Sequence, residues 1–300
     1  MYSSFLRTAL LLLCAMAASV GPSAAATAST ALVIGEVSDE PAKKIRRMQP
    51  LADYLAAHLR EFGVSSGEVQ IAPDLSTMGR WMRGGQVHLY FDSPYPAMIV
   101  INESGARPIL RRWKEGVSEY HSVIFARADS GVFFLRALKG RMLGLEKDYS
   151  TTGYFLPLVQ LIKAGLQPMP KPRPDSEVPR DEVGFVFTAD DRNTIQWVLS
   201  GKVAAGAVDS SAFAKIPAET RRALVVLGES PTVVRHIVMA RPVMPPRLRD
   251  AIKVRLLAMH QSPEGQSVLR VYEETSRFDE FPLDAEMSRV REMYRLIKSR

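Results

Sequence analysis

A hydroxyl cluster, Ser150-Thr151-Thr152-Gly153, lies between an apolar segment and a segment with helical periodicity. Residues 141–146 are typical of a buried strand, and 154–163 carry apolar residues at helical spacing and end before Gly165. The start of a helix leaves backbone N–H groups unpaired and carries a partial positive charge, so adjacent hydroxyls complete a site for a phosphate-like anion. An ordinary Ser or Thr N-cap explains the same residues, and the cluster by itself leaves both interpretations open.

The N-terminus, residues 1–26, has the pattern of a cleaved signal peptide. Met1–Arg7 carries one positive charge, 8–20 is an apolar run too short to span a bilayer, and Ala24–Ala26 supplies small residues for signal peptidase. The single cysteine, Cys14, follows a leucine rather than the small residue of a lipoprotein cleavage site. We therefore expect an exported, periplasmic protein with no disulfide and no cysteine nucleophile.

The chain beyond this segment is modestly basic. The whole chain has a formal net charge of +7, and the first 26 residues contain one arginine and no acid, which leaves +6. This charge suits an anionic ligand or an anionic membrane surface, although a solvated basic face explains it equally well. The basic residues are dispersed, so we expect no nucleic-acid partner. The histidines show no metal-ligand spacing, so we expect neither a metal nor a cofactor.

Strand-like and helix-like segments alternate along most of the chain, which predicts an α/β fold with mostly parallel strands. Strands are expected at 31–37, 69–72, 87–91, 108–113, 120–127, 141–146, 203–208, 223–227 and 237–240. Helices are expected at 43–62, 76–83, 94–104, 133–138, 154–163, 194–200, 246–260, 263–272 and 284–298. The proline-rich segment Gln167–Pro179 is expected to be a surface loop within one lobe.

Several short motifs resemble the phosphate/phosphite/phosphonate-binding proteins of ABC importers, the PhnD-like family. They lie at Met48–Leu55 (MQPLADYL), Gly85–Pro94 (GQVHLYFDSP), Tyr120–Ile124 (YHSVI), Asp129–Gly131 (DSG), Leu138–Gly140 (LKG), Ser150–Tyr154 (STTGY) and Gly201–Ala207 (GKVAAGA). Each motif is short, but their order and spacing together are specific. The resemblance covers nearly the whole chain after the signal segment and marks it as a divergent member.

The resemblance implies the type 2 periplasmic-binding-protein fold, in which two α/β lobes are joined by a two-strand hinge. Lobe one would comprise 27–122 and 235–300, with the C-terminal helices, and lobe two 123–234. The ligand would lie in the cleft between the lobes, where helix N-termini converge. The implied function is capture of a small oxyanion or anion-bearing organic solute, phosphonate- or phosphate-like, by a monomer that delivers it to an ABC permease in the inner membrane.

The family's ligand positions carry over only in part. Its hydroxyl run matches Ser150, Thr151, Thr152 and Gly153, and its hinge tyrosine matches Tyr120. Tyr120 has an alternative role as a strand aromatic packed against its lobe. Leu75 stands where the family has an aromatic hydroxyl.

Asp191 stands where the family commonly has a histidine. Because a carboxylate facing a dianion is unfavourable unless it is paired or protonated, Asp191 is expected to contact a cationic part of the ligand or to pair with Arg192, Arg235 or His236. N-capping of a helix by Asp190 or Asp191 is the alternative.

Arg235 and His236 open an apolar strand-like segment at the expected second hinge crossing, where the family has acidic residues. An arginine there offers a bidentate grip on an oxyanion. A salt bridge between the lobes explains the same pair.

Two other classes of function compete with solute delivery. Asp190, Asp191 and His236 could form an acid–base set of an enzyme, but the chain has no G-x-S-x-G, H-E-x-x-H or P-loop motif. We therefore expect no catalysis. A periplasmic protein that reports its bound state to a membrane sensor would have the same sequence features.

Overall fold

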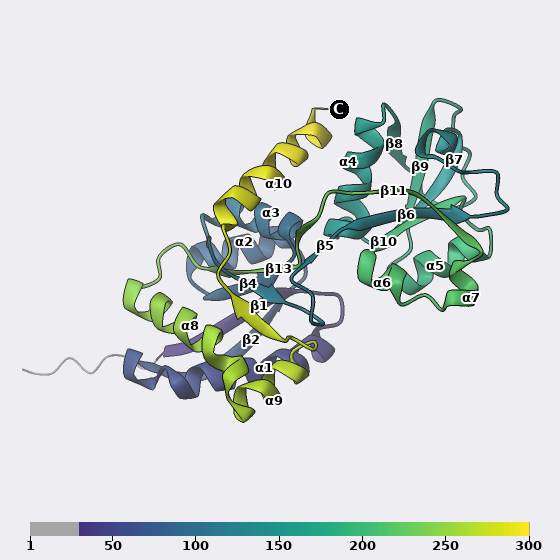
Figure 1. The fold of residues 1–300 in the computed structure, drawn as a ribbon. Coiled ribbons are helices and arrows are strands. Elements are labelled where there is room, and N and C mark those ends of the chain that lie inside the picture. The colour runs from purple at the N-terminus through teal and green to yellow at the C-terminus, as the bar shows by residue number, and fades with distance from the viewer. Residues whose placement is uncertain (1–29, 300) are drawn as a thin grey trace, which may run out of the picture.

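Two lobes, each built around a six-stranded sheet, make up residues 30–299, the part of the chain that the computed structural model describes (Figure 1). The predicted signal peptide, residues 1–26 with Cys14, lies outside the described residues. Within residues 30–299 no helix has the length and apolar character needed to cross a bilayer.

The sheet of lobe one has the strand order β14-β4-β13-β3-β1-β2. The strands are β1 (Thr30–Val37), β2 (Val64–Ala72), β3 (Leu89–Asp92), β4 (Arg107–Trp113), β13 (His236–Ala240) and β14 (Arg277–Asp279). Helices α1 (Pro41–His58), α8 (Pro246–Ala258) and α9 (Pro263–Val271) cover one face, and α2 (Leu75–Gly84) and α3 (Pro94–Ser104) cover the other. Because side chains alternate along a strand, β1 sends Leu32 and Ile34 to the first face and Val33 to the second. Short 3₁₀ turns follow α1 and α8, at η1 (Arg60–Phe62) and η4 (Met259–Gln261).

The sheet of lobe two has the order β11-β6-β10-β7-β9-β8. The strands are β6 (Ser122–Arg127), β7 (Arg141–Leu145), β8 (Gln167–Pro170), β9 (Glu182–Phe187), β10 (Ala205–Asp209) and β11 (Leu224–Glu229). A π-turn, η3 (Thr151–Phe155), continues into α4 (Leu156–Lys163), which packs on one face with η2 (Leu135–Leu138). Helix α5 (Asp191–Leu199) and the short α6 (Ser210–Ala214) pack on the other face, and α7 (Ala218–Arg221) follows α6.

The two sheets are linked by a short antiparallel ribbon of β5 (Glu119–Tyr120) and β12 (Val233–Val234), in which Tyr120 pairs with Val233. The C-terminal helix α10 (Leu283–Lys298) runs from lobe one toward lobe two and contacts both α3 and α4 (Figure 1). One apolar cluster includes Met287 of α10 together with Phe155 and Leu156 of lobe two. The lobes are therefore in apolar contact on the α10 side.

Most of the predicted helices and strands are present within a few residues, but the prediction of mostly parallel strands is wrong. In lobe one β13 pairs antiparallel with β3 and β4, and β14 pairs antiparallel with β4. In lobe two β6 pairs antiparallel with both β10 and β11. Strands β6, β11 and β13 adjoin the points where the chain passes between the lobes, and there its direction reverses. Alternation of strands and helices in sequence does not reveal that reversal.

Part of the proline-rich segment is a strand rather than a loop. Gln167–Pro170 forms β8 and pairs parallel with β9. An edge strand tolerates Pro168 and Pro170, because only one side of the strand needs ladder hydrogen bonds. The structure also contains β9, β14, α6 and α7, which were not predicted, and it divides the predicted strand 120–127 at His121.

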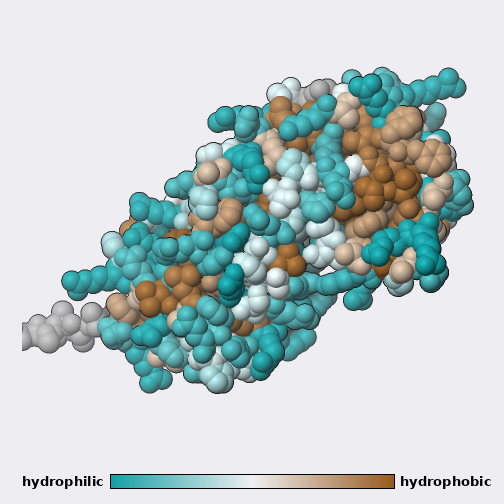
Figure 2. All heavy atoms as spheres, viewed as in Figure 1, coloured by the Kyte–Doolittle hydropathy of each residue, from teal (hydrophilic) through white to brown (hydrophobic). Residues whose placement is uncertain are grey.

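Apolar side chains gather on the surface over β6, β11 and β9 of lobe two (Figure 2). The large apolar side chains exposed on this lobe include Phe133, Phe134 and Phe187. Phe187 contacts Tyr154 and Phe185, so it extends the aromatic packing of the lobe to its surface.

Candidate solute-binding site

A cavity of about 1070 Å³ lies between the lobes and is lined by residues of both. Lobe one contributes the ends of β1 and β3, lobe two contributes the ends of β7 and β10, and the linking segments contribute Lys114, Tyr120 and Arg235. Several of these residues end a strand or follow one directly, and α5 and α6 contribute others. In open α/β sheets this is where ligands bind, because loops and helix starts meet there.

The hydroxyl cluster forms the start of η3 and faces the cavity. The Ser150 hydroxyl accepts a hydrogen bond from the N–H of Gly153 at 2.9 Å and so caps the helix. Pro157 has no N–H, and the carbonyl of Gly153 accepts instead from the N–H of Glu146 at 2.9 Å. The helix start is thus tied to the end of β7. Ser150, Thr151 and Thr152 line the cavity.

Gly153 has a structural role in this turn and does not line the cavity. A Cβ atom on Gly153 would lie 2.5 Å from the Cβ of Glu146, so only glycine allows this close packing.

Thr151 joins the two lobes. Its hydroxyl accepts from the backbone N–H of Tyr95 at 3.0 Å and donates to the Ser93 hydroxyl at 2.8 Å. Both partners belong to the first turn of α3 in lobe one. The Tyr95 ring stacks on Phe155 of lobe two with a centroid distance of 4.5 Å. The starts of α3 and η3 therefore meet at one place.

Tyr120 and Arg235 lie beside this meeting point. The Arg235 guanidinium lies over the Tyr120 ring, 4.4 Å from its centroid. Burial raises the pKa of Tyr120 to about 12, while Arg235 and hydrogen bonds with Thr151 and Ser93 oppose that shift. The Tyr120 hydroxyl therefore stays protonated and remains a neutral donor.

Other helix starts at the cavity are already occupied by carboxylates of the protein. Asp92 accepts from the N–H of Ser93 at 2.6 Å, at the start of α3. Asp209 accepts from the N–H of Ala212 at 2.9 Å, at the start of α6. The start of η3 differs because its cap is the neutral hydroxyl of Ser150, and burial raises the pKa of the Glu146 carboxyl that lies beside it. A bound anion is therefore most compatible with η3.

Asp191 lies in the cavity wall without a hydrogen-bond partner for its buried Oδ1 atom. The helix cap is its neighbour Asp190, which accepts from the N–H of Asn193 at 2.8 Å. Burial raises the pKa of Asp191 well above its ordinary value, and the nearby carboxylates of Glu146 and Asp209 raise it further. Within the lining of the cavity, Asp191 is therefore available to a ligand.

Arg235 and His236, which follow the linking strand β12, have different roles. Arg235 is buried and lies 3.6 Å from Asp209 of lobe two and 4.0 Å from Glu115. Its Nε atom has no hydrogen-bond partner. His236 lies 3.4 Å from the guanidinium of Arg112, and burial together with Lys114 and Arg112 lowers its pKa far below the ordinary value. His236 is thus a neutral wall residue, and Arg235 is the cation of the pair.

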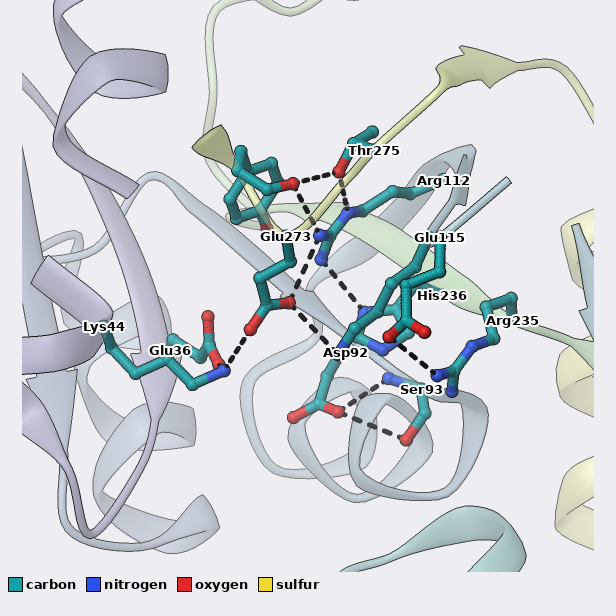
Figure 3. Close-up of polar contacts among 12 residues, drawn as sticks. Glu36, Lys44, Asp92, Ser93, Arg112, Glu115, Arg235, His236, Glu273 and Thr275 are labelled. Carbon is teal, nitrogen blue, oxygen red and sulfur yellow. Dashed lines mark hydrogen bonds and ion pairs between the residues drawn. The ribbon is translucent and has the colours of Figure 1, made fainter. Parts of the chain in front are cut away.

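A buried network of charges forms the lobe-one wall behind His236 (Figure 3). Glu273 accepts from Lys44 at 2.6 Å and lies 3.1 Å from Lys114 and 3.2 Å from Arg112. Lys44 also pairs with Glu36, whose pKa burial raises to about 7 while Lys44 opposes the rise. Glu273 adopts φ 49°, a left-handed conformation that residues other than glycine seldom occupy.

Two ion pairs connect the lobes at the cavity. Lys147 of lobe two lies 2.9 Å from Asp39 of lobe one, and Lys215 of lobe two lies 2.5 Å from Glu115. With the Thr151 contacts, these pairs show that the lobes touch each other at the edge of the cavity.

The structure brings together seven of the eight residues that the sequence proposed for the ligand. The cavity is lined by Tyr120, Ser150, Thr151, Thr152, Asp191, Arg235 and His236. Leu75 is not in the lining but packs against the core of lobe one. Nothing in residues 30–299 groups three or more His, Cys, Asp and Glu side chains so that they could hold a metal ion.

Several lining residues were not anticipated from the sequence: Glu36, Lys44, Asp92, Ser93, Lys114, Glu146, Lys147 and Asp209. Five of them end a strand or follow one directly: Asp92 ends β3, Ser93 follows β3, Lys114 follows β4, Glu146 follows β7, and Asp209 ends β10. Their position at the carboxyl ends of strands was a usable signal. The sequence held no signal for the pairing of Lys44 with Glu273, because the two residues are far apart in the chain.

Comparison with known protein families identifies the family of this chain. The model of a family described as "ABC transporter, phosphonate, periplasmic substrate-binding protein" matches residues 34–285. The chain belongs to this family. The phosphonate-binding family consists of solute-binding transport proteins of ABC importers rather than enzymes, which implies a periplasmic location, a small-molecule ligand and a permease partner.

Solved structures agree with the family in fold. XAC2383 from Xanthomonas citri bound to chloride ion is 26% identical with a TM-score of 0.84, over 90% of this chain and 99% of that one. The structure of XAC2383 bound to ATP is 25% identical with a TM-score of 0.83, over 89% and 98%. PhnD1 from Prochlorococcus marinus in complex with methylphosphonate is 16% identical with a TM-score of 0.64, over 89% and 98%, and shows likeness of fold alone. The two-lobe type 2 periplasmic-binding-protein fold is thereby confirmed.

Proposed function

We propose that this protein is exported through its N-terminal signal segment, captures an organic solute with a phosphonate- or phosphate-like group, and delivers it to an ABC permease. The observation that carries the proposal is the start of η3, which is capped by the neutral hydroxyl of Ser150 and faces the cavity between the lobes beside Arg235. An anion there is held by hydroxyls, backbone N–H groups and one guanidinium.

The binding free energy comes from hydrogen bonds to a charged group. Each such bond contributes about 1.5–3 kcal/mol, more than a neutral one, because the anion polarises its donors. Thr152 and Tyr120 offer hydroxyls, and Arg235 has an unpartnered buried Nε–H. XAC2383 has been solved with chloride and with ATP, both anions, which supports an anionic ligand for this chain.

The acidic side chains of lobe two point to a second feature of the solute. Glu146, Asp191 and Asp209 line the same cavity, and a second anionic group beside them would be repelled. The unpartnered Asp191 carboxylate suits an ammonium group. We therefore propose a zwitterionic solute, with its anion at η3 and its cation at Asp191.

A matched pair of probes tests this function. The protein, purified without its signal segment, is titrated by calorimetry with ethylphosphonate and with 2-aminoethylphosphonate, which differ by one amine. We expect 2-aminoethylphosphonate to bind at least about tenfold more tightly, a difference of about 1.4 kcal/mol. Failure of both probes, and of native mass spectrometry to find any bound anion in protein isolated from periplasm, contradicts the proposed function.

The zwitterion is tested separately from the anion. In Asp191→Asn the two probes are expected to bind with similar affinity, because the carboxylate that favours the amine has been removed. If ethylphosphonate binds as tightly as 2-aminoethylphosphonate to the unmodified protein, the anion site stands and the cation site is wrong.

A further inference from the structure

The cavity remains large although the lobes are already in contact. The Thr151, Lys147 and Lys215 contacts between the lobes are all formed, yet about 1070 Å³ stays open. One water molecule occupies about 30 Å³ in the liquid, and an inorganic oxyanion occupies only a few times that volume. Cavities of this size hold drug-sized organic molecules. A small anion at η3 would leave most of the space unfilled.

Part of the unfilled space is bounded by an apolar wall on lobe two. The wall, called here the lobe-two shelf, consists of Ile195, Leu199, Ala212, Ile216 and Pro217. These residues come from α5, from α6 and from the turn before α7. Polar groups line most of the remaining cavity, so the shelf is a distinct chemical surface within it.

Two of the shelf residues are backed by the core of lobe two. Ile195 and Ala212 pack against the core cluster that contains Phe125, Val198 and Val208. Their other sides face the cavity. An apolar surface that is fixed by its own core does not collapse to exclude water, so covering it with an apolar group yields the full transfer free energy.

The shelf begins where the charged part of the site ends. Asp191, Ile195 and Leu199 are spaced by four residues on α5 and therefore share one face of the helix. At about 1.5 Å per residue, this face extends about 12 Å from Asp191 to Leu199. One solute can thus place charged groups near η3 and Asp191 and an apolar group along α5.

We propose that the lobe-two shelf is a subsite for an apolar substituent, aromatic or aliphatic, of the captured anion. The ligand class is then an organic phosphonate or phosphate ester of substantial size rather than an inorganic oxyanion. This inference rests on the proposed function and specifies which solutes the site prefers.

Calorimetry with three probes tests the subsite: inorganic phosphate, methylphosphonate and phenylphosphonate. They share the anionic group and differ in apolar area. We expect phenylphosphonate to bind at least about tenfold more tightly than methylphosphonate, and inorganic phosphate to bind in the millimolar range or more weakly. Equal or weaker binding of phenylphosphonate overturns the shelf proposal.

Substitutions on the lobe-two shelf test whether the shelf causes the preference for phenylphosphonate. Ile195→Ser is expected to reduce the ratio of phenylphosphonate affinity to methylphosphonate affinity to about threefold or less. The matched control is Ile45→Ser, at a partly exposed isoleucine of α1 outside the cavity lining, which should keep the full preference. A preference that survives both Ile195→Ser and Leu199→Ser overturns the assignment to the shelf.

The outcomes separate this inference from the proposed function. Binding of methylphosphonate with no gain for phenylphosphonate leaves the anion site intact and removes the shelf. Absence of binding by every phosphonate removes the anion site and the shelf with it. Circular dichroism of each variant confirms that a loss of preference is not a loss of fold.

Discussion

The hydroxyl of Thr151 in lobe two lies 2.8 Å from the hydroxyl of Ser93 in lobe one. The same Thr151 oxygen accepts from the N–H of Tyr95, so one side chain satisfies two groups at the start of α3. The sequence alone assigned Thr151 to the ligand. In the structure its hydroxyl also holds the lobes together, so ligand binding and closure share an atom.

Thr151→Val is expected to destabilise the closed arrangement. The change removes the hydroxyl at nearly constant volume and leaves the buried Tyr95 N–H without a partner, which costs about 1–3 kcal/mol. Because the open form can hydrate these groups, the cost falls on closure, and affinity for 2-aminoethylphosphonate should fall by about 5- to 150-fold. Small-angle scattering of the unliganded variant should show a larger radius of gyration.

Ser150→Ala provides the contrasting result. The Ser150 hydroxyl accepts from the N–H of Gly153 within lobe two. Among the hydrogen bonds of residues 30–299, none joins Ser150 to lobe one. We expect the free energy of unfolding to fall by about 0.5–2 kcal/mol with little change in scattering. If the two variants behave alike in scattering and in affinity, Thr151 has no special role in closure.

Asp191 and Arg235 are expected to be coupled in ligand binding. They line the same cavity, and the Arg235 charge lowers the pKa of Asp191 against the effect of burial. A double-mutant cycle of Asp191→Asn and Arg235→Gln, measured with 2-aminoethylphosphonate, should give an interaction energy of at least about 0.5 kcal/mol. The control pairs Asp191→Asn with Arg222→Gln at an exposed site outside the cavity, where additivity is expected. Additive effects in both cycles would remove one or both residues from the binding site.

Asp191 should also make stability depend on pH. Its pKa in the folded protein is raised above the ordinary 3.8, first by burial and then by Glu146 and Asp209. Between 3.8 and the raised value the folded state binds more protons than the unfolded state, so stability falls as pH rises through that window. Asp191→Asn cannot titrate there, so its stability relative to the unmodified protein should grow from pH 4 upward in urea unfolding.

Asp190→Asn is the matched control for this pH effect, because Asn caps a helix about as well as Asp. The pH dependence of its stability is expected to stay close to that of the unmodified protein from pH 4 to 8, because Asp190 raises the pKa of Asp191 less than burial, Glu146 and Asp209 do. If the stability of Asp191→Asn also changed with pH in the same way as that of the unmodified protein, the burial of Asp191 would have no influence on folding.

Glu273→Gln is expected to be strongly destabilising. Glu273 is the shared partner of Lys44, Lys114 and Arg112, and its own side chain is only 7% exposed. Breaking a buried ion pair by neutralising one partner costs about 3–5 kcal/mol, since the remaining charges stay desolvated. Glu274→Gln changes the exposed neighbour and should stay within about 0.5 kcal/mol of the unmodified protein. Chemical unfolding that finds equal stabilities for the two variants contradicts this role for the network.

The sequence predicted those parts of the fold that depend on local pattern. Pro94 and Gly105 delimit α3, and the predicted bounds 94–104 agree with the structure. Periodicity also located the helix after the hydroxyl cluster. It could not identify β14, which has only three residues and depends on pairing with β4.

By itself the sequence determined an α/β protein with a hydroxyl cluster at a helix start, and its motifs indicated the family. These features are local, because helix periodicity, capping and turns depend on residues a few positions apart. Only the tertiary structure decided that Asp190 rather than Asp191 is the cap, that His236 is a neutral partner of Arg112, and that Thr151 contacts Ser93. Burial and partners distant in the sequence set the protonation and contacts of a side chain, and these exist only once the two lobes have folded and come into contact.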